Sequence, residues 1–173
     1  MIEFLKLIIF LYRIKIVGET MVRLMEEKDI DDVSNLLKQV NLVHHLGRPD
    51  LFRKNNKYSN EELKELLKCD DYHIFVYECD NKVVGHAFCV TKIQEETKLL
   101  NHVKTLYIDD ICVDSNNRNK GIATSLFNYV KKYAKDNNYY NITLNVWSFN
   151  DSAYNFYEKM GLSPQKITME EIL

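Results

Sequence analysis

A polar turn that leads into a helix carries the residues best suited to binding an anion. The turn spans 113–123 and reads V-D-S-N-N-R-N-K-G-I-A, with Arg118 and Lys120 just ahead of Gly121. Backbone N–H groups at the start of a helix lack intrahelical partners and lie at the positive end of the helix dipole, so they bind phosphate groups. Gly121 and Ala123 are small enough for a ligand to approach the backbone, although a glycine here is also ordinary turn chemistry. The pattern matches neither G-x-G-x-x-G nor G-x-x-x-x-G-K-[ST], which argues against a dinucleotide fingerprint and a P-loop.

The elements that must position this turn follow from hydrophobic periodicity. Alternating β-branched segments predict strands, and apolar residues at helical spacing behind capping residues predict helices. The expected strands cover 22–25, 72–78, 83–93, 103–113, 140–146 and 165–169, and the expected helices begin at Asp29, Ser59, Gly121 and Asn150. Asp29 and Ser59 are expected N-caps, and Gly161 is expected to end the last helix in the left-handed conformation.

The order of these elements predicts the fold class. Asp80 and Asn81 separate two strand segments and indicate a β-hairpin, so the first part of the sheet should be antiparallel. The strands 103–113 and 140–146 flank a helix and should be parallel, joined by a right-handed crossover. The sequence therefore predicts an α/β (α+β) fold, with a mixed central sheet flanked by helices.

Composition limits the classes of protein to consider. The 173 residues fit one domain, and 46% hydrophobic with 28% charged residues exclude collagen-like, disordered and polytopic membrane chains. A net charge of −2 gives no strong positive field, so neither nucleic acid nor a membrane is an expected partner. The cysteines and histidines lack metal-ligand spacing, so no metal is expected. Free thiols in a reducing cytoplasm are the expected state of the cysteines.

The first twenty residues stand apart from this pattern. The stretch 2–17 is apolar but is interrupted by four charged side chains, so a spanning helix or a signal peptide is a poor match. Two alternatives remain, which are an amphipathic segment packed on the domain and an upstream extension in front of a start at Met21. The second is favoured, with residues 1–20 as an extension outside a domain of residues 21–173, because the first strand and helix already follow Met21.

Two motifs in the chain resemble those of the GCN5-related N-acetyltransferase (GNAT) family. The R-x-x-G-x-A run at 118–123 resembles that family's acetyl-CoA pyrophosphate loop, Gln/Arg-x-x-Gly-x-Gly/Ala. The segment 150–162 resembles the late signature Asn-x-x-Ala-x-x-Phe-Tyr-x-x-x-Gly-Phe, with Leu162 where Phe is usual. The resemblance covers roughly 21–169 and includes the order of the elements, so it implies a GNAT-like acyltransferase fold.

The resemblance also implies acetyl-CoA as co-substrate and suggests its contacts. Backbone N–H groups of 119–124 would hold the pyrophosphate, with charge from Arg118 and Lys120. The main chain of 111–113 would pair with the pantetheine arm where this strand splays from the next, and an N–H there would stabilise the thioester oxyanion. Asn150 would contact pantetheine, or would only cap the last helix. The expected cofactor-binding residues are Ile111, Cys112, Val113, Arg118, Asn119, Lys120, Gly121, Ile122, Ala123, Thr124 and Asn150.

The same resemblance suggests the catalytic groups. Tyr157 matches the family's general acid, and a phenol with a pKa near 10 can protonate a departing thiolate. The attacking amine needs a base, for which Asp109 and Asp110 rank almost equally because both precede the pantetheine-pairing segment. Strand alternation is expected to send these two carboxylates to opposite faces of the sheet, so that at most one points at the substrate.

The resemblance thus implies an acetyl-CoA-dependent N-acetyltransferase, in which a primary amine attacks directly in a ternary complex. The acceptor, a small molecule or a protein, stays unnamed, and the segment 43–52 lies where the family builds the acceptor site. A non-catalytic acyl-CoA sensor or interaction domain and an enzyme that uses a longer acyl-CoA are the alternatives. A homodimer formed through the last strands is possible by family analogy.

Overall fold

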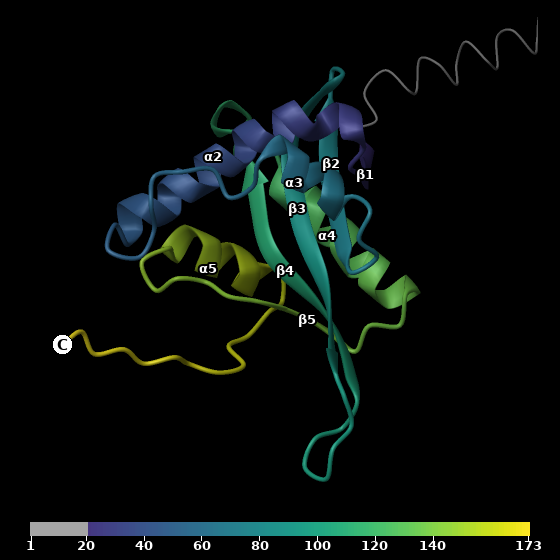
Figure 1. The fold of residues 1–173 in the computed structure, drawn as a ribbon, viewed down its shortest axis with the longest axis vertical. Helices are drawn as coiled ribbons and strands as arrows, with labels where there is room; N and C mark the ends of the chain where they lie inside the picture. The colour runs from purple at the N-terminus through teal and green to yellow at the C-terminus, as the bar shows by residue number, and fades with distance from the viewer. Residues whose placement is uncertain (1–20) are drawn as a thin grey trace, which may run out of the picture.

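One mixed sheet organises the protein in a computed structural model that describes residues 21–173 (Figure 1). The sheet has the order β1-β2-β3-β4-β5, with antiparallel pairing from β1 to β4 and parallel pairing between β4 and β5. The strands are β1 (Met21–Leu24), β2 (Tyr72–Cys79), β3 (Lys82–Gln94), β4 (Val103–Val113) and β5 (Asn141–Leu144). The predicted antiparallel start and parallel end of the sheet are confirmed, and the predicted extension 1–20 lies outside the described residues.

Helices cover both faces of the sheet and create two separate cores. The helices are α2 (Ile30–Gly47), α3 (Asn60–Leu66), α4 (Ile122–Asp136) and α5 (Asp151–Lys159), with short 3-10 turns η1 (Glu27–Asp29) and η2 (Ser115–Asn117). One core joins α2 and α3 to the sheet around Leu37, Leu63 and Phe88. The other core joins α4 to the opposite face around Phe127, and α5 packs against it. The predicted fold class, a mixed sheet flanked by helices, is confirmed.

Local signals placed most element ends correctly. Asp80 and Asn81 both have positive φ, at 52° and 60°, which suits a tight hairpin turn built from residues that tolerate the left-handed region. Ser59 forms a capping box with Glu62, and Gly161 ends α5 at φ 93°. The first helix runs on to Gly47, past the end of its apolar pattern.

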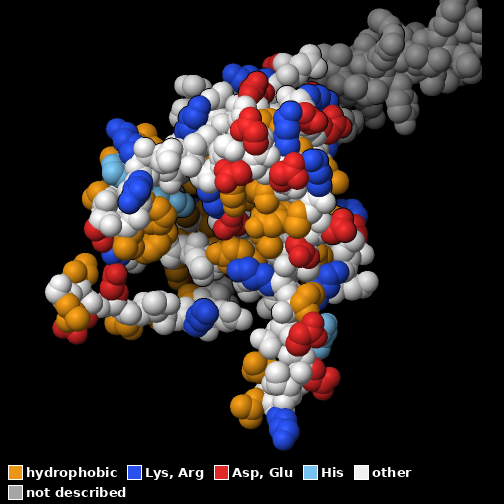
Figure 2. Space-filling model, viewed as in Figure 1, with side chains coloured by type: hydrophobic (Ala, Val, Ile, Leu, Met, Phe, Trp, Pro, Cys, Tyr) orange, Lys and Arg blue, Asp and Glu red, His pale blue; other side chains and the backbone are white. Residues whose placement is uncertain are grey.

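The predicted last strand, 165–169, is wrong, and the predicted strand 140–146 is shortened to β5. The segment 163–173 has no regular structure, and its apolar side chains Ile167 and Met169 are 79% and 87% exposed. A strand needs a neighbour for its backbone hydrogen bonds, and none of the described residues supplies one there. The segment instead forms an extended tail that stands away from the body of the protein (Figure 2). Near its end, Glu170 pairs with Arg48 beyond the C-terminus of α2.

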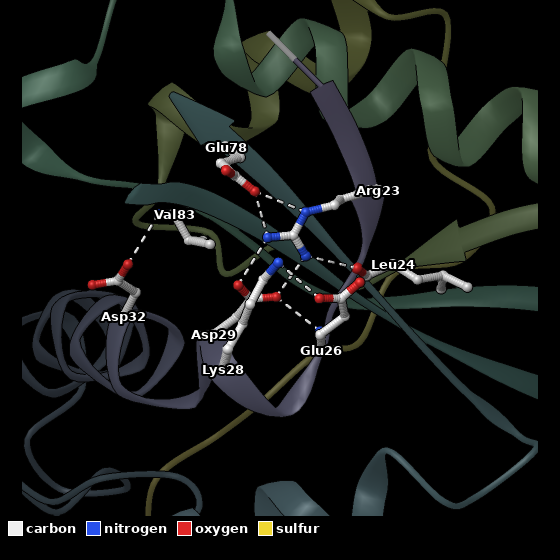
Figure 3. A network of polar contacts seen from close by, with 8 residues as sticks. All are labelled: Arg23, Leu24, Glu26, Lys28, Asp29, Asp32, Glu78 and Val83. Atoms are coloured by element: carbon white, nitrogen blue, oxygen red, sulfur yellow. Dashed lines mark hydrogen bonds and ion pairs between the residues drawn. The ribbon is translucent and has the colours of Figure 1, made fainter. Parts of the chain in front are cut away.

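A charge network fixes the start of α2 against β1 and β2 (Figure 3). The Asp29 carboxylate accepts hydrogen bonds from both Nη atoms of Arg23, at 2.6 and 2.8 Å, and from the Glu26 backbone N–H at 2.8 Å. Arg23 also donates from Nε to Glu78 on β2 at 2.9 Å. Asp29 therefore marks the predicted helix boundary, but its side chain binds Arg23 and the preceding turn and makes no capping bond to α2 itself. The network sets the position from which α2 crosses the sheet.

Replacing Asp29 should destabilise the fold far more than replacing an exposed partner of an ion pair. We expect Asp29→Ala to lower the free energy of unfolding by about 3 kcal/mol, because it leaves the mostly buried Arg23 guanidinium without a main acceptor. Asp136→Ala, which removes an exposed pair with Lys132 on α4, should cost less than about 0.5 kcal/mol. Urea denaturation at pH 7 measures both values, and similar losses in the two variants would contradict the assignment.

The pH dependence of stability supplies a second measurement on Asp29. Burial alone would raise the pKa of Asp29, but the hydrogen bonds from Arg23 and from the Glu26 backbone, with the charge of Arg23, together outweigh burial and hold that pKa below its usual value. A carboxyl with a lowered folded-state pKa stabilises the fold above its ordinary pKa, and this contribution disappears as the pH falls through the folded-state pKa. Wild-type stability should therefore fall on acidification below about pH 4, and more steeply than that of Asp29→Ala.

Candidate functional site

The turn before α4 presents a run of unpaired backbone donors. Asn119 and Gly121 have positive φ, at 62° and 79°, and the first backbone bond of α4 runs from the Ser125 N–H to the Gly121 carbonyl at 3.0 Å. From 119 to 124, no backbone N–H donates to an acceptor within the described residues. These donors lie at the positive end of a 15-residue helix. The arrangement suits a phosphate or pyrophosphate, as the sequence predicts.

Gly121 is required for its conformation, and its surroundings leave room for a ligand. A φ of 79° lies in the left-handed region that residues with a Cβ rarely adopt, and a Cβ built on Gly121 meets no atom of residues 21–173 within 4 Å. The flanking cations are held by the turn, since Arg118 Nε donates to the Val113 carbonyl at 3.4 Å and Lys120 Nζ to Asn117 Oδ1 at 3.0 Å. Both cations are exposed and lie beside the unpaired donors.

Beside this turn, β4 parts from β5. The parallel pairing ends at Ile108 and Leu144, whereas β4 continues to Val113 with β3 along its other edge. The edge of 109–113 that faces away from β3 therefore has no strand partner among the residues that the structure describes. The predicted splay is present, and it leaves 111–113 open to an extended ligand that could pair with it as an added strand.

A β-bulge in β4 changes how the two aspartates are placed. Phe88 pairs with Asp110 and the next residue, Cys89, pairs with Ile108, so Asp109 is an extra residue on β4. The bulge switches the alternation, because Ile108 belongs to the core under α4 and Cys112 to the core under α2 and α3. The expectation that strict alternation separates the two carboxylates is therefore wrong.

Both carboxylates instead bind the same ammonium group. Lys57, on the segment between α2 and α3, donates from Nζ to Asp109 Oδ2 at 2.6 Å and to Asp110 Oδ2 at 3.2 Å. Burial alone would lower the pKa of Lys57, but the charges of Asp110 and Asp109 outweigh it and raise that pKa above its usual value. Lys57 is therefore a protonated cation at neutral pH.

Asp110 has a second, fully buried partner in His86 on β3. The His86 Nε2 and Asp110 Oδ1 atoms lie 2.5 Å apart, and His86 Nδ1 has no partner within the described part of the chain. Burial would raise the pKa of Asp110, but His86 and then Lys57 outweigh burial and hold the pKa below its usual value. Sequence reasoning missed His86 and Lys57, although one signal for His86 was present, since it interrupts the apolar run V-V-G-H-A-F-C-V.

Tyr157, on α5, packs against the apolar core that α4 forms with the sheet. Its partly buried ring packs 6.2 Å from the ring of Phe127 and 5.1 Å from that of Phe156. Burial, and then the negative charge of Asp110, raise the pKa of Tyr157 above its usual value, so the phenol keeps its proton at neutral pH. Asn150 caps α5, because its Oδ1 accepts the Ala153 N–H at 3.2 Å. The capping alternative for Asn150 is thus present, and contact with pantetheine stays a prediction.

An aromatic cluster lies at the end of α2, where the acceptor region is expected. His44 and Phe52 have ring centroids 5.1 Å apart, and Trp147 meets Phe52 edge-on at 5.4 Å. Phe149 covers Gly47 so closely that a Cβ there would lie 2.2 Å from its ring. Of the segment 43–52 that the sequence assigns to the acceptor region, 43–47 forms the last turn of α2 and 48–52 forms the loop after it.

Comparison with known proteins identifies the family. The model of the acetyltransferase (GNAT) family matches residues 40–162. The chain belongs to the GNAT acetyltransferase family.

Within residues 21–173, no helix is long and apolar enough to cross a membrane, and no group of three potential metal ligands comes together.

Individual relatives agree with the family match. An uncharacterised N-acetyltransferase of Methanocaldococcus jannaschii is 27% identical over 150 residues, which are 84% of this chain and 62% of that protein. The chain thus spans less than two thirds of this relative's length. A mutant protein from Bacillus halodurans superposes with a TM-score of 0.85 at 28% identity, over 88% of this chain and 99% of that one. An aminoglycoside N-acetyltransferase in complex with CoA shares the fold, with a TM-score of 0.67 at 14% identity, over 88% of this chain and 98% of that one.

The two aspartates should contribute differently to stability. We expect Asp110→Asn to cost about 3 kcal/mol, because it removes a buried negative charge that pairs with both His86 and Lys57. Asp109→Asn should cost less than about 1 kcal/mol, because that side chain is partly exposed and Asp110 still binds Lys57. Chemical denaturation at pH 7 provides the comparison, and an equal loss in the two variants would show that burial of Asp110 is unimportant.

Proposed function

We propose that the protein transfers the acetyl group of acetyl-CoA to a primary amine by direct attack in a ternary complex. The observation that carries this proposal is the continuity of two unpaired backbone surfaces, the donors of 119–124 and the free edge of 109–113. Together they match the two halves of CoA, since a pyrophosphate needs clustered donors and pantetheine amides need a strand-like partner. Membership of the GNAT family supports the same assignment.

In this proposal the main chain does most of the binding. N–H groups of 119–124 hold the pyrophosphate, and Arg118 and Lys120 add positive charge from the rim. The segment 111–113 pairs with pantetheine and directs an N–H at the thioester oxygen, where it stabilises the negative charge that develops on attack. Asn150 contributes mainly by fixing the start of α5, which carries Tyr157.

Proton transfer falls to two side chains, Tyr157 and Asp109, beside a third that holds charge. Tyr157 stays protonated and donates its proton to the departing CoA thiolate. Asp110 is buried and has a lowered pKa, so its role is to hold positive charge in the site. Asp109 is the more exposed of the pair and takes the proton of the incoming amine, directly or through water.

A second candidate function is non-catalytic binding of acyl-CoA. The observation that favours it is the ion pairing of both candidate bases with Lys57, which leaves neither carboxylate free. The two functions differ in one result. Tight acetyl-CoA binding with no acetyl transfer to a broad panel of primary amines would favour the sensor and contradict the enzyme.

Calorimetric titration of acetyl-CoA into the full chain tests the binding half of the proposal. Gly121→Glu should abolish binding, because it puts a carboxylate among donors that await a phosphate. Gly121→Ala is the matched control. Its Cβ meets no atom of the described part of the chain within 4 Å, and the substitution should only strain the backbone by about 1 kcal/mol, leaving most of the binding intact. Failure of the unmodified protein to bind acetyl-CoA would overturn the proposal.

Tyr157→Phe tests the chemical half. We expect kcat to fall about 100-fold while the KM for acetyl-CoA changes less than about threefold, because the ring still packs and only the proton donor is lost. Phe156→Tyr is the matched control, since it adds a hydroxyl to the neighbouring ring of the same helix. Steady-state assays of thiol release with a reactive amine from the panel give both constants. An unchanged kcat would remove Tyr157 from the mechanism.

A further inference from the structure

Lys57 occupies the position that the proposed function reserves for a substrate. The acceptor must bring a primary amine to Asp109, beside the open edge of β4, and the Lys57 side chain already ends in a primary amine there. Its Nζ lies 2.6 Å from Asp109 and 3.2 Å from Asp110. No separate acceptor is needed to place an amine at this point of the site.

The segment that carries Lys57 is anchored so that this placement is repeatable. Asn56 Nδ2 donates to Ser34 Oγ on α2 at 2.9 Å, and Ser59 begins α3 with a capping box. The Tyr58 ring stacks on Phe88 of β3, with centroids 5.9 Å apart. Lys57 is thus held on both sides by contacts to the core, while its own side chain keeps 35% of its surface exposed.

We propose that Lys57 is an acetyl acceptor of this protein, modified within the same chain. This inference rests on the proposed function, since the donor is acetyl-CoA bound along β4. The Lys57 side chain ends in a primary ammonium group bound to Asp109, as the amine of an external substrate would be.

The transfer balances with the groups already placed. Lys57 first loses one proton, through Asp109, to solvent. The nitrogen lone pair then attacks the thioester carbonyl carbon, so that a C–N bond forms and the C–S bond breaks. The electron pair of the broken bond leaves with sulfur, which takes a proton from Tyr157, and the second proton lost by the nitrogen restores the phenol. The products are an N-acetyl-lysine, free CoA and one proton in solution.

Acetylation of Lys57 would change the site that performs it. An amide carries no charge, so Asp109 and Asp110 would lose the cation that they share. Asp109, the more exposed of the two carboxylates, would then be available to an external ammonium group. The modification would therefore occur once per chain and would alter the acceptor preference of the enzyme afterwards.

The experiment is a time course of the full chain with acetyl-CoA, followed by peptide mass spectrometry. Lys68 and Lys132 are matched internal controls, because each forms an ion pair with a carboxylate but is far more exposed, at 69% and 75%. Uncatalysed acetylation favours these exposed amines. Transfer within the site should reverse the order, with Lys57 labelled about tenfold faster than either control.

Two further measurements test the route of the transfer. Excess free CoA should suppress labelling of Lys57 but not of Lys68 or Lys132, and the rate at Lys57 should not depend on protein concentration. Lys57→Arg confirms the peptide assignment by losing only that label. Labelling of Lys57 no faster than the controls, or unaffected by CoA, would overturn the inference. If calorimetry shows acetyl-CoA binding in the same sample, that result overturns this inference alone, whereas absent binding also overturns the proposed function.

Discussion

The extra residue in β4 is the constraint on which the rest of the site depends. Without the bulge at Asp109, strict alternation would put the residues after Ile108 on the wrong faces of the sheet, and Asp110 would point into the apolar core under α4. With it, Ile108 and Cys112 each reach their own core while Asp110 meets His86. The bulge also lies where β4 parts from β5, because twist and bending increase at such a position. One insertion in a strand thus accounts for both the carboxylate pair and the open edge beside it.

Buried charge explains why the segment between α2 and α3 lies over the site. Asp110 is largely buried, and a buried carboxylate is tolerated only with partners. His86 supplies one partner from the sheet, and Lys57 supplies the other from the loop between α2 and α3. The ion pair of Lys57 with the aspartates therefore acts together with the contacts of Asn56 to α2 and of Tyr58 to β3 to hold the loop over the site. The aromatic cluster of His44, Phe52 and Trp147 then closes the outer end of the same loop.

Local sequence signals predicted much of the fold and less of the site. Capping residues, turn residues and periodicity are short-range features, so Ser59, Asp80-Asn81 and Gly161 marked their elements correctly. The prediction of a strand at 165–169 was wrong, because an alternating pattern forms a strand only if a neighbouring strand exists to pair with it. The meeting of Lys57 with Asp109 and Asp110 links positions more than fifty residues apart through a bulge, and no local pattern reports such a contact. The backbone donors of 119–124 were predictable because they depend only on where a helix begins.

The short pairing between β4 and β5 has a consequence for the order in which the protein assembles. The first three strand pairs include two hairpin-connected neighbours, β2–β3 and β3–β4, whose contacts are local in the chain, whereas β5 joins only after α4 has crossed the sheet. Contacts between distant segments close late in folding, and small cooperative units open first in the native state. Four residue pairs join β5 to β4, as few as join β1 to β2 at the other edge of the sheet. The two outer strands, β1 and β5, are therefore the parts of the sheet whose amide hydrogens should exchange earliest with solvent, and the open edge of 109–113 begins where the pairing with β5 stops.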